Sequence, residues 1–176
     1  MERRLISTTR ECPARLVPTG DPITIPRNTF VTLTQSLGGT YTVIVNGNMA
    51  RVDGENADAL GFEPQTLSFA PPSDGRISEV QVSDALSSVY DPEIPVNIVD
   101  LGLIYAVDID RDAGRVSIDM TLTAPGCGMG DVLVAEVRRR VGQVPFVSRV
   151  DVNLVFDPPW SRDRMTEEAQ LTLGLF

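Results

Sequence analysis

Histidine and lysine are absent from this sequence of 176 residues, and cysteine occurs only twice. Without histidine, the chain cannot build a Ser-His-Asp triad, a Cys-His nucleophile pair or a histidine zinc site. Without lysine, it cannot form a Schiff base or the lysine contact of a P-loop. These absences remove the usual groups for acid-base and nucleophilic catalysis, so we expect that the protein is not a conventional enzyme.

Positive charge and long apolar runs are also scarce. Acidic residues number 24 against 15 basic residues, and the net charge of −9 argues against nucleic acid as a partner. No apolar run approaches the ~20 residues of a membrane span, and the N-terminus lacks a secretory signal pattern. Cys12 and Cys127 lie too far apart for a CxxC pair and indicate no disulfide framework. We therefore expect a cytoplasmic protein with no membrane partner.

The first part of the chain, residues 1–62, has the pattern of a small β-rich module. The runs Phe30–Thr34 and Tyr41–Val45 are rich in β-branched and aromatic residues, and glycines separate them. The pair Asn46-Gly47 is a strong hairpin signal, so we expect a meander of three or more strands. Residues 63–77 are rich in proline and lack periodicity, which indicates a linker.

Residues 78–176 are predicted to form a second domain of alternating helices and strands. A helix begins either at Ser83 or near Ser78 and ends before Pro92. Two strands joined by a tight turn follow, then a helix at about 131–141 and a third strand. In the first helix, the residues predicted to face the core are Val80, Ala85, Leu86 and Val89. In the first strand they are Leu103, Tyr105, Val107 and Ile109, in the second Val116, Ile118, Met120 and Leu122, and in the third Val150, Val152, Leu154 and Phe156.

A helical crossover between the second and third strands would make them parallel. The predicted fold class is therefore α+β, with a small N-terminal β module followed by a two-layer α-β-β-α-β domain that has a three-stranded mixed sheet. A last amphipathic segment is expected at about 164–173. The run Arg138–Arg140 suits the negative end of its helix and is predicted to be a solvated face. Trp160, after two prolines, suits either packing or recognition.

Cys127 lies where an alternating strand leads into a helix. Pro125 and the nearby glycines predict a tight connection in which backbone N–H groups can approach the sulfur. The positive end of the following helix would lower the pKa of the thiol and favour the thiolate, which binds metals and attacks electrophiles. The alternative is a small buried hydrophobic residue in a turn, which is the commoner role of a free cysteine.

The second half of the chain resembles the iron-sulfur cluster assembly domain family, whose eukaryotic members act in cytosolic cluster insertion. The motifs that carry the resemblance are Asp91-Pro92-Glu93, Asp100-Leu101-Gly102-Leu103-Ile104 and Thr123-Ala124-Pro125-Gly126-Cys127. Further segments are similar to the SufT branch, in which a small β domain precedes the assembly domain. These segments are Arg10–Ala14, Gln35–Val43, Asp157-Pro158-Pro159-Trp160 and Arg164-Met165-Thr166.

The resemblance implies an auxiliary factor in iron-sulfur protein maturation. It assigns Cys127 as the functional thiol and metal ligand, with Asp91 and Glu93 beside it as cofactor-binding residues. The implied cofactor is an iron-sulfur cluster or iron, held transiently and labile, since thiolate is the ligand that such clusters require. The implied partners are the iron-sulfur assembly machinery and client apo-proteins, and we expect a homodimer.

Two other interpretations remain open on the residues alone. The Asp91-Pro92-Glu93 segment has the composition of a simple helix-terminating turn. The protein as a whole could be a non-catalytic adaptor or accessory subunit that works only by contacts. A cysteine-dependent enzyme is the remaining class, but such an enzyme would lack a visible proton shuttle.

Overall fold

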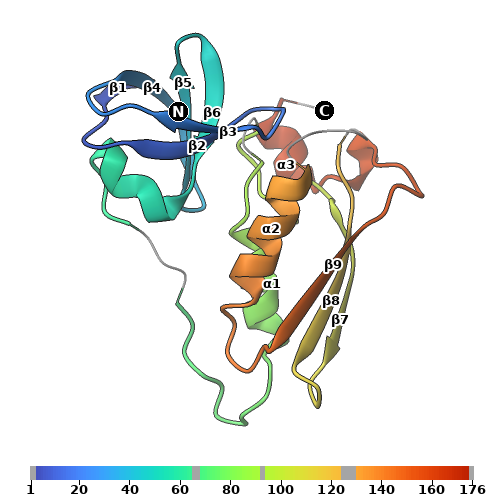
Figure 1. Cartoon of the computed structure of the whole chain (residues 1–176). Helices are drawn as coiled ribbons and strands as arrows, with labels where there is room; N and C mark the ends of the chain where they lie inside the picture. Colours follow the sequence, from blue (N-terminus) through green and yellow to red (C-terminus); the bar gives the residue numbers. More distant parts are fainter. Residues whose placement is uncertain (1–2, 65–67, 92–93, 124–129, 175–176) are drawn as a thin grey trace. The chain divides into compact units, whose positions relative to one another are not determined.

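The chain divides into two compact units, each with its own sheet (Figure 1). The computed structural model describes residues 3–64, 68–91, 94–123 and 130–174. The first unit comprises residues 1–66 and 90–95, and the second comprises residues 67–89 and 96–176. Helices and two sheets occur in one chain, so the α+β prediction is confirmed. No described helix is both long and apolar enough to cross a membrane.

The first unit is built around a six-stranded antiparallel sheet with strand order β1-β4-β5-β6-β2-β3. Its strands are β1 (Arg4–Ser7), β2 (Cys12–Leu16), β3 (Pro22–Ile25), β4 (Phe30–Leu37), β5 (Thr40–Val45) and β6 (Asn48–Val52), followed by the 3-10 helix η1 (Gly54–Leu60). Asn46 and Gly47 have φ of 50° and 80°, which is the positive-φ pair that a tight hairpin turn requires. The predicted meander β4-β5-β6 is therefore confirmed.

One face of this sheet carries the core of the first unit. Its fully buried members include Cys12, Val43 and Val52, and the Tyr41 ring stacks on Phe62 with ring centres 5.1 Å apart. The sequence did not identify β1, β2 and β3, because these strands are only four or five residues long and two of them contain a proline. Pro22 is tolerated because it is the first residue of the edge strand β3. Pro13 lies in the part of β2 that pairs with β3 alone, since β6 pairs with β2 only at Arg15 and Leu16.

The second unit contains a three-stranded sheet with strand order β7-β8-β9. Its elements are α1 (Glu79–Ser87), β7 (Ile104–Asp110), β8 (Arg115–Met120), α2 (Gly130–Val141), β9 (Arg149–Leu154), the 3-10 helix η2 (Arg162–Arg164) and α3 (Glu167–Thr172). Strands β7 and β8 pair antiparallel, whereas β8 and β9 pair parallel, so the predicted mixed sheet is confirmed. Helix α2 is the crossover that the parallel pair needs.

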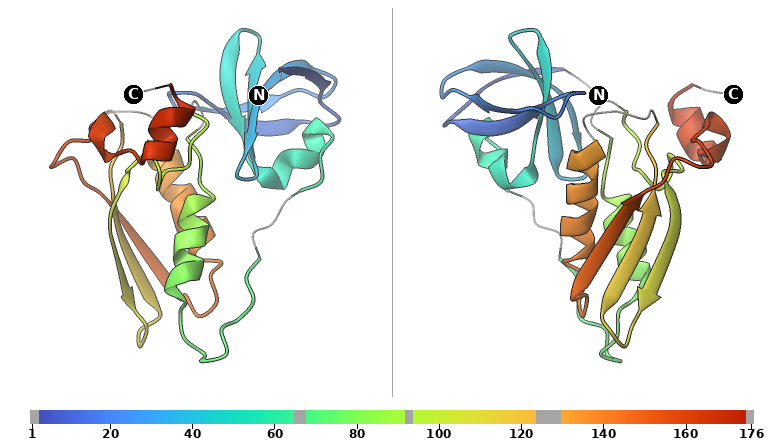
Figure 2. Two further views of the ribbon diagram at one scale, coloured as in Figure 1. Left: turned by 180° about the vertical axis from the view of Figure 1, so that it is seen from behind. Right: turned by 45° about the vertical axis from the view of Figure 1, so that its right-hand side comes forward.

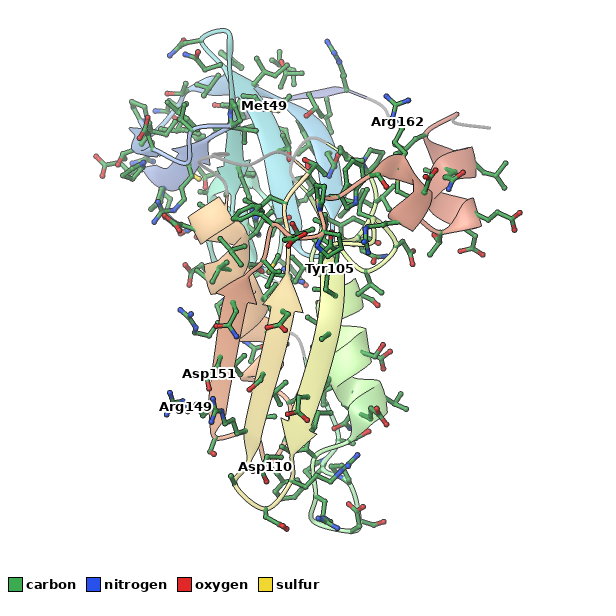
Figure 3. The ribbon with its side chains drawn as sticks, turned by 90° about the vertical axis from the view of Figure 1, so that its right-hand side faces the viewer. Met49, Tyr105, Asp110, Arg149, Asp151 and Arg162 are labelled. Carbon is green, nitrogen blue, oxygen red and sulfur yellow. The ribbon has the colours of Figure 1, made fainter. Side chains whose placement is uncertain are left out.

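Helices α1 and α2 cover one face of this sheet (Figure 2). The inward residues of β8, Val116, Ile118 and Met120, are fully buried, as predicted. The other face is polar and open. There Asp151 pairs with Arg115 at 2.6 Å and with Arg149 at 3.0 Å, and hydrogen bonding from Arg149 lowers the pKa of its carboxyl (Figure 3).

Helix α1 begins near Ser78 rather than at Ser83. The Ser78 hydroxyl accepts a hydrogen bond from the Gln81 backbone N–H at 3.3 Å, which is the geometry of an N-terminal cap. This start turns Val82, Ala85 and Leu86 toward the core. The prediction that Val80 is buried is wrong, because Val80 lies on the opposite face of the helix and is 69% exposed.

A bulge in β7 breaks the predicted alternation of that strand. Ile104 lies opposite Met120, but Ala106 lies opposite Asp119, so Tyr105 is an extra residue on the β7 side. Tyr105 therefore leaves the row of core-facing residues to which the sequence assigned it. In Figure 3, Tyr105 lies at the opposite end of the sheet from Asp110.

The arginine run at the end of α2 is only partly a solvated face. Arg138 and Arg139 are exposed, but the side chain of Arg140 is 9% exposed and ion-pairs with the buried Glu136 one turn earlier. Arg140 also donates to the Ser88 carbonyl oxygen at 2.6 Å. This pairing joins α2 to the end of α1, so the prediction of a wholly solvated run is wrong for Arg140. The spacing of four residues between Glu136 and Arg140 was the sequence feature from which this ion pair could have been predicted.

We expect Arg140→Gln to lower the free energy of unfolding by about 2 kcal/mol or more, because it removes a charge partner from the buried Glu136 carboxylate. Arg139 still contacts Glu136, which limits the loss. Urea unfolding followed by circular dichroism measures the difference. The exposed Arg138→Gln is the matched control and should stay within about 0.5 kcal/mol of the parent. Equal stability of the two variants would contradict the structural role of Arg140.

Candidate functional site

Of the three site residues predicted from the sequence, only Asp91 lies in the described part of the chain. Cys127 and Glu93 fall in residues 124–129 and 92–93, which lie outside it. The structure therefore does not test whether these three residues come together. It does describe both ends of the connection that contains Cys127.

That connection leaves the sheet where β8 ends. The Thr121 backbone N–H donates to the Leu103 carbonyl at 2.8 Å, and the Val155 N–H donates to the Met120 carbonyl at the same distance. Backbone hydrogen bonds to the neighbouring chain segments on both sides of β8 therefore continue to residues 120 and 121. Leu122 is buried and Thr123 is exposed, so the connection starts from the surface at the carboxyl ends of β8 and β9.

At its other end, the connection enters α2 at Gly130, three positions after Cys127. The helix predicted at about 131–141 is thereby confirmed. A Cβ atom at Gly130 would lie 2.8 Å from Leu122 Cδ1, so glycine lets the start of the helix pack closely on the residue that leaves β8. The two ends of the connection are held against each other by this contact. In the sequence, Gly130 is one of several glycines near Cys127, and its position alone does not predict this close approach.

Thr121 carries a buried hydroxyl beside this connection. The residue is fully buried, and no described group lies within hydrogen-bonding distance of its Oγ1. A buried hydroxyl without a partner costs about 1–3 kcal/mol relative to one that is satisfied. Alternation alone would place Thr121 on the polar face of the strand, so the burial of its hydroxyl could not be predicted from the pattern.

Asp91 has a local structural role. Its Oδ1 accepts a hydrogen bond from the Ile94 N–H at 3.2 Å, and its backbone carbonyl accepts one from the Gln35 side chain at 3.0 Å. A carboxylate that accepts a hydrogen bond from the backbone N–H three residues on is a local side-chain-to-backbone contact. The proposed role of Asp91 beside Cys127 stays a prediction.

Cys12 lies in the core of the first unit. It is fully buried on β2, and burial raises the pKa of its thiol to about 11. A thiol in this state is almost entirely protonated at neutral pH, and it is the thiolate that binds metals. Within the described ranges, no group of three or more His, Cys, Asp or Glu side chains is arranged to hold a metal ion.

Comparison with known proteins adds the identity of relatives. A family model described as "Iron-sulfur cluster assembly protein" matches residues 79–153. A protein from Porphyromonas gingivalis named Fe-S protein maturation auxiliary factor is 50% identical over 97 residues, which are 55% of this chain and 91% of that protein. The Fe-S protein maturation auxiliary factor SufT of Staphylococcus aureus is 41% identical over 87 residues, which are 49% of this chain and 98% of that protein.

A solved structure gives a similar picture. The crystal structure of a domain of unknown function from Bacillus anthracis aligns with a TM-score of 0.52 and 39% sequence identity. The alignment covers 56% of this chain and 92% of that chain. These relatives span about half of the present chain, so the resemblance of its N-terminal β module to the SufT branch stays a prediction.

We expect the two cysteines to differ in alkylation by iodoacetamide near neutral pH. Cys12 should react very slowly in the native protein, because its thiol is buried and its pKa is raised to about 11. Cys127 should react faster than a model thiol with a pKa near ~8.5 if the start of α2 favours its thiolate. Peptide mass spectrometry of labelled protein measures both rates, and labelling in urea supplies the control in which both react. Rapid native labelling of Cys12 would contradict its place in the core.

We expect Thr121→Val to raise the free energy of unfolding by about 1 kcal/mol, because valine has the same shape without the unsatisfied hydroxyl. The exposed Thr123→Val is the matched control and should change stability by less than about 0.5 kcal/mol. Urea midpoints compare the three proteins. A loss of stability in Thr121→Val would show that the hydroxyl has a partner in solution.

Proposed function

The chain belongs to the family of iron-sulfur cluster assembly proteins, and from this premise we propose that it is an auxiliary factor in iron-sulfur protein maturation that works through Cys127. The observation that carries the proposal is the 50% identity over 97 residues to a relative named for that role. The proposed clients are apo-proteins that receive a cluster, and the proposed partners include the assembly machinery that supplies it. The cluster is therefore cargo for this protein.

Cys127 is the proposed ligand because of its chemistry and its place in the chain. It is the only cysteine within the matched residues 79–153. It precedes the first residue of α2 by three positions, and the positive end of a helix favours a thiolate. Cys12 is a poor alternative, since it is fully buried and its pKa is raised. Asp91 and Glu93 are proposed as polar neighbours that contact the cargo or a client.

The number of available thiolates implies a shared and labile cluster. An iron-sulfur cluster is usually held by about four thiolates, and a chain without histidine cannot substitute imidazole. One chain offers Cys127, and burial of Cys12 leaves small thiols or client cysteines to complete the set. We propose that the cluster bridges two protomers of a homodimer, because isologous pairing is the commonest form of assembly. A weakly held cluster suits a protein that must release it.

No catalytic role is proposed. The chain has no histidine or lysine to act as a conventional proton shuttle, and its relatives are named as auxiliary or maturation factors. The site proposed here serves binding and transfer in the cytoplasm. A non-catalytic adaptor that never holds metal is the alternative that the following experiment separates from it.

We expect Cys127→Ser to lose the visible chromophore after anaerobic reconstitution with iron and sulfide, because it removes the one thiolate proposed as a ligand. Iron and sulfide per chain, visible absorbance and solution mass are measured together. Reconstituted parent protein should show the absorbance and a mass that corresponds to two chains. Cys127→Ser should remain a folded monomer by circular dichroism and mass.

Cys12→Ala is the matched control, and alanine suits the apolar core position better than serine would. This variant should keep most of the iron and sulfide. If Cys127→Ser held as much of both as the parent, or supported client maturation equally well in cells, the metal role of Cys127 would be wrong and the adaptor function would replace it.

A further inference from the structure

The C-terminal tail of the second unit is fastened to the turn that precedes β7. The Trp160 indole N–H donates to the Leu101 carbonyl at 2.7 Å, and the Thr166 backbone N–H donates to the Asp100 carbonyl at 2.9 Å. These two bonds fix the tail at both ends of residues 160–166. Trp160 therefore packs the tail onto the domain, which agrees with the packing alternative for this residue.

The turn itself is shaped to receive the tail. Gly102 has a φ of 77°, and a Cβ atom there would lie 2.3 Å from the Arg164 carbonyl oxygen. Only glycine permits both this backbone conformation and this close approach. Next to Arg164, Met165 is buried, which anchors the tail from the inner side. The backbone of Arg164 is thus held in one position.

Tyr105 supports the Arg164 side chain. The Tyr105 hydroxyl donates to the Pro158 carbonyl at 2.9 Å, which holds the ring at the edge of the sheet. The guanidinium carbon of Arg164 lies 4.4 Å from the centre of that ring. A guanidinium over an aromatic face keeps its N–H groups at its edges, where they can still bind a planar anion. The β7 bulge is what brings Tyr105 into this position.

A hollow of about 390 Å³ lies between these groups, lined by Gly102, Ile104, Tyr105, Pro158 and Arg164. Its volume is at the small end of the range typical of small-molecule sites, about 300–1,000 Å³. Ile104 and Pro158 provide apolar surface, and Arg164 provides the cation. No carboxylate among the described residues forms an ion pair with Arg164, whereas Arg115 and Arg149 both pair with Asp151.

We propose that this hollow binds a small monocarboxylate with an apolar body, its carboxylate held by Arg164 and its body against Ile104 and Pro158. A fork of guanidinium N–H groups matches the two oxygens of a carboxylate. Arg164 is the single cation among the residues that line the hollow, and the chain as a whole has a net charge of −9. This charge suits a singly charged ligand better than a phosphate dianion or a polyanion. The proposal rests only on described residues of the second unit and is independent of Cys127.

The test is a titration of the full chain with 3-methylbutanoate, followed by amide chemical shifts in NMR. We expect saturable shifts in residues 101–106 and 157–166. The neutral isostere 3-methylbutanamide should produce no such shifts, because it lacks the charge that Arg164 recognises. Shifts elsewhere in the chain, or equal binding of the amide, would overturn the proposal.

Arg164→Gln should weaken 3-methylbutanoate binding by about tenfold or more, since it removes the charge-assisted hydrogen bonds. Arg162→Gln is the matched control, because Arg162 is exposed in the same short 3-10 helix η2 and should leave binding unchanged. Native chemical-shift dispersion establishes that each variant is folded. Unchanged affinity in Arg164→Gln would overturn the assignment.

The same carboxylate chemistry could be presented by a glutamate side chain of a protein. A blocked tripeptide, acetyl-Ala-Glu-Ala-amide, is therefore titrated in parallel. Binding of the free acid in preference to the peptide supports a small-molecule site. Tighter binding of the peptide would overturn the small-molecule assignment and identify the hollow as a contact for an acidic segment.

Discussion

The parallel pairing of β8 with β9 is the constraint on which the second unit depends. Parallel neighbours cannot be joined by a tight turn, so the chain must cross over the sheet through a helix. Helix α2, which starts at Gly130, makes this crossing and buries its apolar side on the sheet. The connection that contains Cys127 is therefore required to run from the carboxyl end of a strand to the N-terminus of a helix. This is the setting in which a thiolate is favoured.

Buried polar groups have different effects in the helical layer of this unit and at the end of its sheet. Glu136 and Arg140 satisfy each other and join α2 to the end of α1 at Ser88. Thr121, at the end of β8, has no such partner among the groups that the structure describes. A satisfied buried pair gives the helices a defined register, whereas an unsatisfied hydroxyl only costs stability. Buried polar groups are therefore paired in the helical layer, whereas the end of the sheet beside the Cys127 connection contains a buried hydroxyl without a described partner.

The same end of the sheet also receives the C-terminal tail. The β7 bulge removes Tyr105 from the core-facing row of the strand. Position 102 must be glycine, because a Cβ atom there would clash with the backbone of Arg164. The tail is held by hydrogen bonds and Arg164 lies over the Tyr105 ring. Segments that looked like family signatures in the sequence thus form a defined hollow near the point where β8 ends.

The sequence by itself determined the elements with strong local signals. Alternation identified β8, the pair Asn46-Gly47 identified a hairpin, and the sequence also predicted the helix α2 that follows the Cys127 segment. Only the tertiary structure decided which side chains are buried: a bulge removed Tyr105 from the core row, a one-turn ion pair buried Arg140, and the sheet of the first unit enclosed Cys12. The physical reason is that periodicity records the preference of each residue for its own helix or strand, whereas burial and pKa depend on groups that the fold brings from distant positions.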